Sequence, residues 1–279
     1  MSRNYLPGTQ IEIINEVERG KIKYGLFDFD GTISILREGW QDIMHPVCVE
    51  MICGNTAPTP EIDAEVRTMI DETTGIQTIL QMERLVEMIK EKGFVPESEI
   101  LDAQGYKAIY LERLMVPVRE RLAKLASGEM TREQAIVKGA PDFLDIISKK
   151  ADLELYVFSG TDRDDVRNEA KVLGVAPYFK EIWGALRTFQ EYSKEKIIQD
   201  LVKEHQLSGP EVMAVGDGPV EIRNVKAAGG IAIGVPSDEK AGFGLDEEKR
   251  ERLIKAGADI IVPDFSEAQA LADYLFPAE

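Results

Sequence analysis

The sequence contains few of the residues from which disulfide frameworks and imidazole sites are built. Its 279 residues include two cysteines, Cys48 and Cys53, and two histidines, His45 and His205. Two thiols do not make a disulfide framework, so we expect packing cysteines and a reducing, cytoplasmic location. A His-rich zinc site or a Ser-His-Asp triad would need one of the two histidines, and neither lies in a recognisable motif.

Positive charge and long apolar runs are scarce as well. Lys and Arg together number 33 against 50 Asp and Glu, which gives a net charge of −17. Such a chain repels phosphate backbones and anionic membrane surfaces. No apolar run approaches the roughly 18 residues of a membrane span, and the first eight residues carry no apolar signal core. We therefore predict no nucleic-acid partner, no membrane partner and no secretion, and leave the oligomeric state open.

The hydrophobic pattern changes twice along the chain. Residues 24–29 are typical of a short buried strand, and residues 39–138 follow a helical period, with breaks at 56–60, 74–75 and 93–96. From residue 139 onward, short apolar strands alternate with helices, which predicts a parallel sheet covered on both faces. We expect a Rossmann-like α/β core of residues 1–38 and 139–279, interrupted by a helical cap domain of residues 39–138.

Chemically active side chains follow the predicted strands. Ligands of open parallel sheets bind beyond the carboxyl ends of the strands, so these side chains are expected to meet. They are Asp28 and Asp30 after the first strand, Ser159 after the second, and Asp217 and Glu221 after the fourth. Lys194 lies between the second and the fourth strand. Carboxylates crowded together do not all ionise without a cation, and Mg²⁺ binds one or two of them while keeping waters for a phosphate.

These residue types can perform phosphoryl transfer. An aspartate can be the nucleophile that forms an aspartyl-phosphate, and a second carboxyl two residues later can protonate the leaving oxygen. Gly31 and Gly160 allow the backbone to approach phosphate oxygens, and Lys194 adds positive charge.

The set resembles the haloacid dehalogenase superfamily of phosphatases, over about residues 22–38 and 139–265. The family's four motifs occur in order: Asp28, Asp30, Gly31 and Thr32; the apolar strand 155–158 ending in Ser159; Lys194; and Gly216-Asp217 followed by Glu221. The tail 256–261 is similar to members related to phosphoglycolate phosphatase. Members of the superfamily place a helical cap after the first motif, as the insert here suggests.

The resemblance implies a role for each acid. Asp28 is expected to be the nucleophile, and Asp30 the general acid and then the base, with its backbone carbonyl on the metal. Asp28, Asp217 and Glu221 are expected to complete the Mg²⁺ site. Glu221 has an alternative interpretation as an ordinary acid in the first turn of a helix.

The resemblance also implies a phosphate-binding set. Its members are glycines and polar residues: Gly31, Thr32, Ser159, Gly160 and Lys194. Lys194 has a rival in Lys196, and the segment after Ser159 is also interpreted as a helix cap.

Three features of the sequence stay outside these motifs. Gln77, Gln81 and Arg84 share one helix face, which we expect to be solvated, whereas the break at 73–75 could project toward the site. Arg163 could meet an anionic substrate. The insertion 237–255 has no predicted role.

The sequence thus predicts a Mg²⁺-dependent phosphatase that acts on a small phosphorylated metabolite. One alternative is a phosphomutase of the β-phosphoglucomutase type, and another is a binding protein that kept the fold and lost turnover. A dehalogenase or phosphonatase is disfavoured because those relatives lack the second acid of the first motif, here Asp30. The natural substrate is not predicted.

Overall fold

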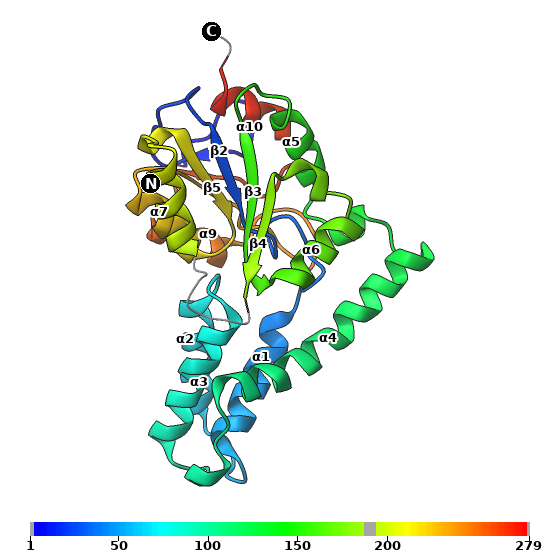
Figure 1. The fold of residues 1–279 in the computed structure, drawn as a ribbon, viewed down its shortest axis with the longest axis vertical. Coiled ribbons are helices and arrows are strands. Elements are labelled where there is room, and N and C mark those ends of the chain that lie inside the picture. Colours follow the sequence, from blue (N-terminus) through cyan, green and yellow to red (C-terminus); the bar gives the residue numbers. More distant parts are fainter. Residues whose placement is uncertain (1–2, 187–193, 278–279) are drawn as a thin grey trace.

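A seven-stranded sheet forms the centre of the protein, seen here in a computed structural model that describes residues 3–186 and 194–277 (Figure 1). The strands lie in the order β1-β7-β6-β5-β2-β3-β4, and all neighbours are parallel except β1 and β7. The strands are β1 (Glu12–Ile13), β2 (Tyr24–Phe27), β3 (Glu154–Asp162), β4 (Glu181–Ala185), β5 (Val212–Gly216), β6 (Ile231–Gly234) and β7 (Ile260–Ile261). The predicted α/β fold is confirmed. The two-residue strand β1 was not predicted, because it is too short to show an alternating pattern.

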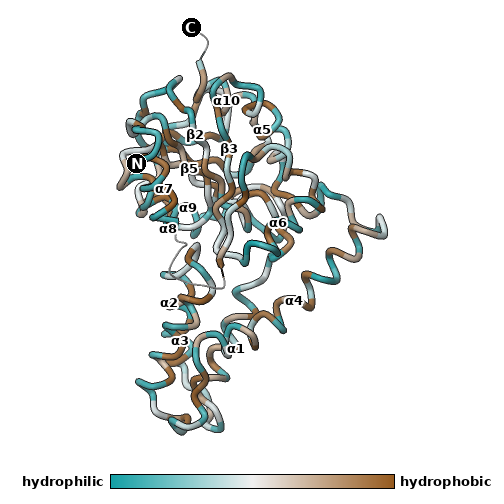
Figure 2. The backbone as a smooth tube through the Cα atoms, in the orientation of Figure 1, coloured by the Kyte–Doolittle hydropathy of each residue, from teal (hydrophilic) through white to brown (hydrophobic). Residues whose placement is uncertain are grey.

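Helices cover both faces of the sheet, since successive strand residues point to opposite sides. Phe27 and Leu26 are both fully buried, but they belong to different hydrophobic clusters. The helices beside Phe27 are α5 (Ala140–Ile147), α6 (Arg163–Val172) and α10 (Ala268–Leu275). Those beside Leu26 are α7 (Lys194–Glu204), α8 (Pro219–Ala227) and α9 (Glu247–Ala256). Figure 2 shows apolar residues concentrated in the central strands. These strands are hydrophobic along nearly their whole length because helices bury both of their faces.

Between β2 and β3 the chain forms four further helices, here called the helical insert. They are α1 (Trp40–Cys53), α2 (Pro60–Thr73), α3 (Thr78–Lys92) and α4 (Ala103–Ser127). The insert has a hydrophobic cluster of its own, which includes Val47, Val66 and Leu85. Its helices end close to the predicted breaks, where Thr59 caps α2 and Gly93 ends α3 in a left-handed conformation. The domain boundaries at 38/39 and 138/139 stay predictions.

The helical insert lies beyond the carboxyl ends of β3 and β4 (Figure 1). Lys107 of α4 forms an ion pair with Asp162, and Asp71 of α2 pairs with Arg252 of α9 at 2.7 Å. A hydrogen bond of 2.8 Å from Arg121 of α4 to the carbonyl of Leu36 adds a third link. These contacts hold the insert over the edge of the sheet where the strand-end residues lie.

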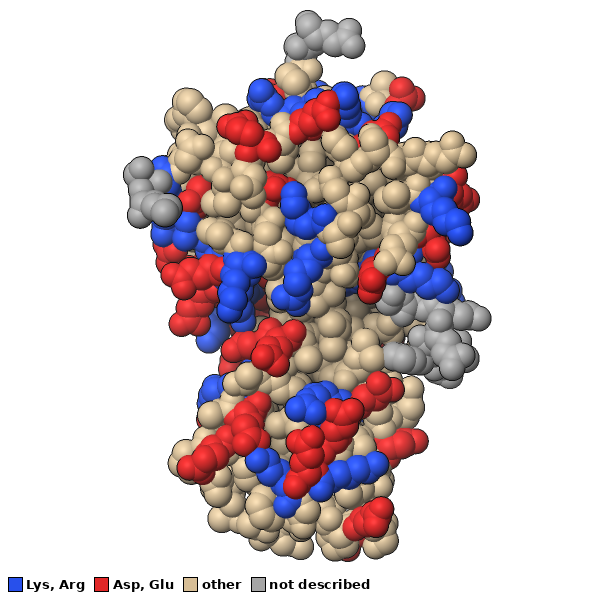
Figure 3. All heavy atoms as spheres, turned by 90° about the vertical axis from the view of Figure 1, so that its left-hand side faces the viewer, with Lys and Arg blue, Asp and Glu red and all other residues tan. Residues whose placement is uncertain are grey.

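The surface charge is mixed. On the face in Figure 3, acidic and basic side chains alternate over both parts of the molecule. Among the helices in the described part of the chain, none has both the length and the apolarity that a membrane crossing requires.

We expect Phe143→Ala to destabilise the core by about 3–5 kcal/mol, because removing a buried aromatic ring leaves a cavity. The Phe143 ring is fully buried and stacks on Phe265 with centroids 5.2 Å apart. Urea unfolding of the full chain measures this loss. As a control, Val116→Ala, at a side chain 64% exposed, should change the free energy of unfolding by less than about 0.5 kcal/mol. Equal stability of the two variants would contradict the assignment of the core.

Candidate active site

The parallel register of the central strands brings the predicted site residues together. Phe27 of β2 lies opposite Val157 of β3 and Val215 of β5, so the three strands reach their carboxyl ends at the same level. The amide of Asp28 donates to the carbonyl of Val215 at 2.8 Å, which continues the ladder past β2. The residues that follow each strand, including Asp28, Ser159 and Asp217, are therefore neighbours in space.

Asp28 is a buried carboxylate that accepts hydrogen bonds from two neighbouring groups. Its Oδ1 accepts from the amide of Phe29 and its Oδ2 from Nζ of Lys194, each at 2.8 Å. Lys194 Nζ also lies 3.2 Å from Oε2 of Glu221. Burial raises the pKa of Asp28 well above its ordinary value; Lys194 opposes this effect, whereas Glu221 and Asp217 add to it. Of the two rival lysines, Lys194 is the one beside Asp28, whereas Lys196 is exposed.

Asp30 faces the same space with one oxygen held and the other unpartnered. Its Oδ2 accepts from the hydroxyls of Thr161 at 2.7 Å and Ser159 at 3.4 Å. Its Oδ1 is buried without a hydrogen-bond partner among the described residues, and Nε of Arg37 lies 3.8 Å away. A buried carboxylate oxygen without a partner is unusual, which suggests that a ligand or water completes it.

Three of the predicted acids form a cluster that suits a cation. Asp28, Asp217 and Glu221 each offer one oxygen, and these atoms lie within 4.8 Å of one another. Glu221 stands in the first turn of α8, where it also accepts from the amide of Gly218 at 2.7 Å. An all-oxygen donor set fits a hard divalent ion. The Asp30 side chain lies outside the cluster, and a contribution from its backbone carbonyl stays a prediction.

Two glycines are required by close contacts. Gly31 has φ of 74°, and a Cβ there would lie 2.2 Å from Oδ2 of Asp217. A Cβ on Gly160 would lie 2.5 Å from the carbonyl oxygen of Ile76 in the helical insert. Gly31 therefore lets the first strand end approach Asp217, and Gly160 lets the insert approach the core.

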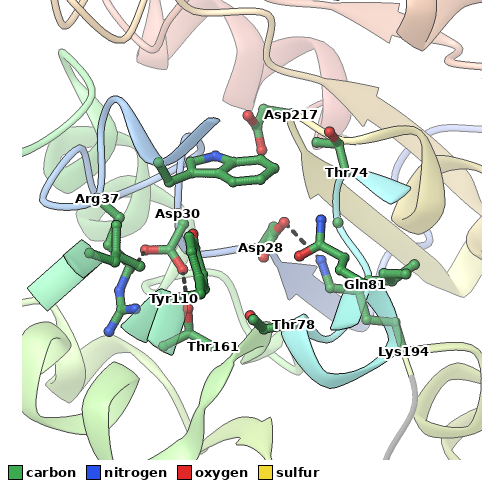
Figure 4. A pocket seen from close by; sticks show the side chains of 15 residues that line it. Asp28, Asp30, Arg37, Thr74, Thr78, Gln81, Tyr110, Thr161, Lys194 and Asp217 are labelled. Carbon is green, nitrogen blue, oxygen red and sulfur yellow. Dashed lines mark hydrogen bonds and ion pairs between the residues drawn. The ribbon is translucent and has the colours of Figure 1, made fainter. Parts of the chain in front are cut away.

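A cavity of about 80 Å³ lies between the core and the helical insert (Figure 4). The predicted residues that line it are Asp28, Asp30, Gly160, Lys194 and Asp217. The others lie behind this surface: Gly31, Thr32, Ser159 and Glu221. Thr32 is fully buried and directs its hydroxyl to Oδ1 of Asp217 at 3.5 Å. Arg163 is exposed and is not part of the lining.

The expectation of a solvated face on α3 was wrong for two of its three residues. Gln77 and Gln81 are each 4% exposed, and Gln81 lines the cavity, whereas Arg84 is exposed as expected. The periodicity of a helix shows which face is polar, but not that another part of the chain covers it. The turn after α2 does reach the site, since Thr74 and Gly75 line the cavity.

The segment 237–255 supplies a buried ion pair that the sequence analysis missed. Lys249 of α9 donates to Oδ2 of Asp217 at 3.1 Å and pairs with Glu239. Burial lowers the pKa of Lys249, but Asp217 and then Glu239 outweigh this effect and raise it above its ordinary value. No local signal marks Lys249, because it stands in a helix rich in exposed charges. Ser237 extends the contact by donating to the carbonyl of Gly31 at 3.1 Å.

Arg37 and Glu169 form a second buried pair beside Asp30. Nη2 of Arg37 lies 2.6 Å from Oε1 of Glu169, and both side chains are nearly inaccessible. Burial raises the pKa of Glu169 to about 7, although Arg37 lowers it. The two residues are far apart in sequence, so no motif spacing could have revealed the pair.

Known proteins share this architecture. A family model for haloacid dehalogenase-like hydrolases matches residues 25–235. A β-phosphoglucomutase structure from Clostridium difficile superposes with a TM-score of 0.56 at 16% identity, covering 91% of this chain and 97% of that one. A predicted phosphoglycolate phosphatase from Haemophilus somnus gives 0.57 at 15% identity, with 90% and 98% covered. A haloacid dehalogenase-like hydrolase from Streptococcus pneumoniae gives 0.56 at 17% identity, with 90% and 98% covered.

The matched residues span most of the chain, so the protein belongs to the haloacid dehalogenase-like hydrolase family. At these identities the structural likeness establishes the fold and not the substrate. A search of curated proteins finds no match.

Lys249→Met should tighten the binding of a divalent cation at the acidic cluster. The substitution removes a buried positive charge beside Asp217. Even at the dielectric constant of water, one charge at this distance changes the affinity by about threefold to tenfold. Glu239→Gln should weaken binding by a similar factor, because it removes the opposite charge. Titration with Mn²⁺ measures the affinity of both variants, by calorimetry or by the electron paramagnetic resonance signal of free Mn²⁺.

Lys255→Met is the matched control, because Lys255 is an exposed residue of the same helix. It should leave the affinity for Mn²⁺ within about twofold of the parent value, since solvent screens its charge. Weaker binding by Lys249→Met would instead show that Lys249 acts by holding Asp217 in place.

Proposed function

We propose that this hydrolase is a Mg²⁺-dependent phosphatase that cleaves a small phosphomonoester through an aspartyl-phosphate. The observation that carries the proposal is the pairing of Asp28 with Asp30 at the floor of one cavity. Lys194 contacts one oxygen of Asp28, while one oxygen of Asp30 has no hydrogen-bond partner among the residues that the structure describes. Two carboxyl groups in different environments suit a nucleophile and a proton donor.

In the first step, a carboxylate oxygen of Asp28 attacks phosphorus and the bond from phosphorus to the ester oxygen breaks. Protonated Asp30 gives its proton to the departing oxygen, so the alcohol leaves neutral. Thr161 and Ser159 donate hydrogen bonds to Oδ2 of Asp30, which fixes the orientation of this carboxyl group at the cavity. Lys194 stabilises negative charge on the phosphoryl group and on Asp28.

In the second step, Asp30 takes a proton from water and the resulting nucleophile attacks phosphorus. The bond from phosphorus to Asp28 breaks, which releases phosphate and restores both carboxyl groups. Mg²⁺ held by Asp28, Asp217 and Glu221 would supply the positive charge that lets a dianionic phosphate enter among carboxylates.

The helical insert would act as the cap predicted for residues 39–138. It supplies most of the cavity wall opposite Asp28, and the cavity volume of about 80 Å³ suits a small substrate. A small phosphorylated metabolite of the cytoplasm fits this geometry and the net charge of −17, which disfavours polyanions.

A phosphomutase remains the second candidate, favoured by the likeness to a β-phosphoglucomutase structure. Product analysis with a hexose 1-phosphate separates the two, because a mutase returns hexose 6-phosphate and a phosphatase returns inorganic phosphate. A protein that only binds its ligand is the third candidate, and it would show no turnover of an aryl phosphate.

Asp28→Asn should lower phosphatase turnover to background, since an amide is a poor nucleophile and the covalent step is lost. The assay is hydrolysis of p-nitrophenyl phosphate with Mg²⁺, and an unchanged circular dichroism spectrum shows that the fold survives. Asp200→Asn, at an exposed residue of α7, is the control and should keep full activity. Turnover by Asp28→Asn comparable to the parent would exclude Asp28 as nucleophile.

Asp30→Asn should reduce hydrolysis of alkyl phosphates far more than formation of the phosphoenzyme from p-nitrophenyl phosphate. The phenolate leaves without a proton, whereas an alkoxide needs one, and general acid catalysis contributes about 10²–10⁴-fold. Rapid-quench measurement of the first turnover isolates this step. If both substrates lose the same factor, Asp30 does not protonate the leaving group.

A further inference from the structure

The part of the cavity contributed by the helical insert is uncharged and combines polar with apolar side chains. Its lining residues include Trp40, Thr74, Thr78, Gln81, Tyr110 and Leu114. These residues come from α1, the turn between α2 and α3, α3 itself, and α4. The floor of the cavity belongs to the core acids, so the organic part of a bound phosphate ester would contact this uncharged wall and its polar groups.

Tyr110 presents its hydroxyl group to the cavity. The residue is 2% exposed, and within residues 3–186 and 194–277 its hydroxyl has no hydrogen-bond partner. Figure 4 shows its ring beside Asp30. Burial raises the pKa of the phenol, so the hydroxyl stays protonated. Because Tyr110 lines the cavity, its hydroxyl can donate to an oxygen of a bound ligand.

Acceptors lie in the same wall. The side-chain amide of Gln81 donates to the hydroxyl of Thr73 at 3.2 Å, which orients the group. The hydroxyl of Thr74 donates to the carbonyl of Ile70 at 2.9 Å, so its lone pairs can accept from the cavity side. A wall with both donors and acceptors suits ligand hydroxyl groups, which both donate and accept.

The cations of the described lining are already engaged by carboxylates. Arg37 lies 2.6 Å from Glu169, and Lys194 lies 2.8 Å from Asp28. A substrate carboxylate in this cavity would therefore be desolvated beside Asp30 and Asp28 with little compensation from these residues.

From these contacts we infer that the substrate is the phosphate ester of an uncharged polyhydroxy compound, a polyol or sugar, and that Tyr110 hydrogen-bonds one of its hydroxyl groups. The inference rests on the proposed phosphatase activity and adds its substrate class. Phosphate esters of carboxylic acids are disfavoured by the same contacts.

Glycerol 3-phosphate and 3-phosphoglycerate test the class, because they have the same carbon count and differ by a hydroxymethyl group against a carboxylate. We expect kcat/KM to be at least tenfold higher for glycerol 3-phosphate. Calorimetric binding to the Asp28→Asn variant with Mg²⁺ gives a second comparison that needs no turnover. A preference for 3-phosphoglycerate in either measurement overturns the inference.

Tyr110→Phe tests the contact itself by removing one oxygen atom. It should lower kcat/KM for glycerol 3-phosphate about tenfold, the size of one hydrogen bond, and lower that for p-nitrophenyl phosphate less than threefold. Tyr106→Phe is the control on α4, because its hydroxyl accepts from the amide of Leu101 and does not line the cavity. Equal losses on both substrates would overturn the role of Tyr110. Absence of p-nitrophenyl phosphate hydrolysis by the parent protein would instead refute the phosphatase activity, and the binding comparison would still decide the substrate class.

Discussion

The buried contact between Lys194 and Asp28 is the interaction on which the site depends. Asp28, Asp217 and Glu221 crowd their oxygens within 4.8 Å, and ionised carboxylates at such distances repel strongly when water is excluded. Lys194 opposes this repulsion at two of the three acids, and Lys249 opposes it at the third. The two lysines reach the cluster from α7 and α9, so the helices on this face of the sheet stabilise the charge arrangement as well as the hydrophobic core.

The sheet determines which residues can share this charge cluster. Parallel strands in register end at the same edge of the sheet. The residues after β2, β3 and β5 are therefore brought together by the backbone, before their side chains make any contact. The glycine at position 31 then decides how closely two of these ends approach, since any side chain there would strike Asp217. Burial of the acids thus follows from backbone geometry, and the lysines compensate for it.

The sequence was sufficient to predict what the backbone pattern controls. Asp28, Asp30 and Asp217 follow strands that hydrophobic runs mark clearly, and Lys194 begins a helix with a clear period. Lys249, Arg37 and Tyr110 could not be found in this way. Each becomes part of the site through contacts between segments far apart in the chain. Lys249 and Tyr110 stand in ordinary charged or amphipathic helices, and Arg37 stands in a turn. Gln81 shows the same limit, because a polar helix face is solvated only if nothing covers it.

The residues that the sequence predicts and those that it does not predict also have different roles in the proposed reaction. Residues beside the strand ends, such as Asp28 and Lys194, contact the phosphoryl group in the proposed reaction, which is the same in every phosphate ester. In the same proposal, the helical insert would contact the part of the ester that varies between substrates, through cavity-lining residues such as Tyr110 and Gln81. The strand-end residues are confined by the register of the sheet, whereas the insert has its own hydrophobic cluster and can change its cavity wall without disturbing the sheet. Selectivity can therefore change in this fold while the chemistry of the core stays fixed.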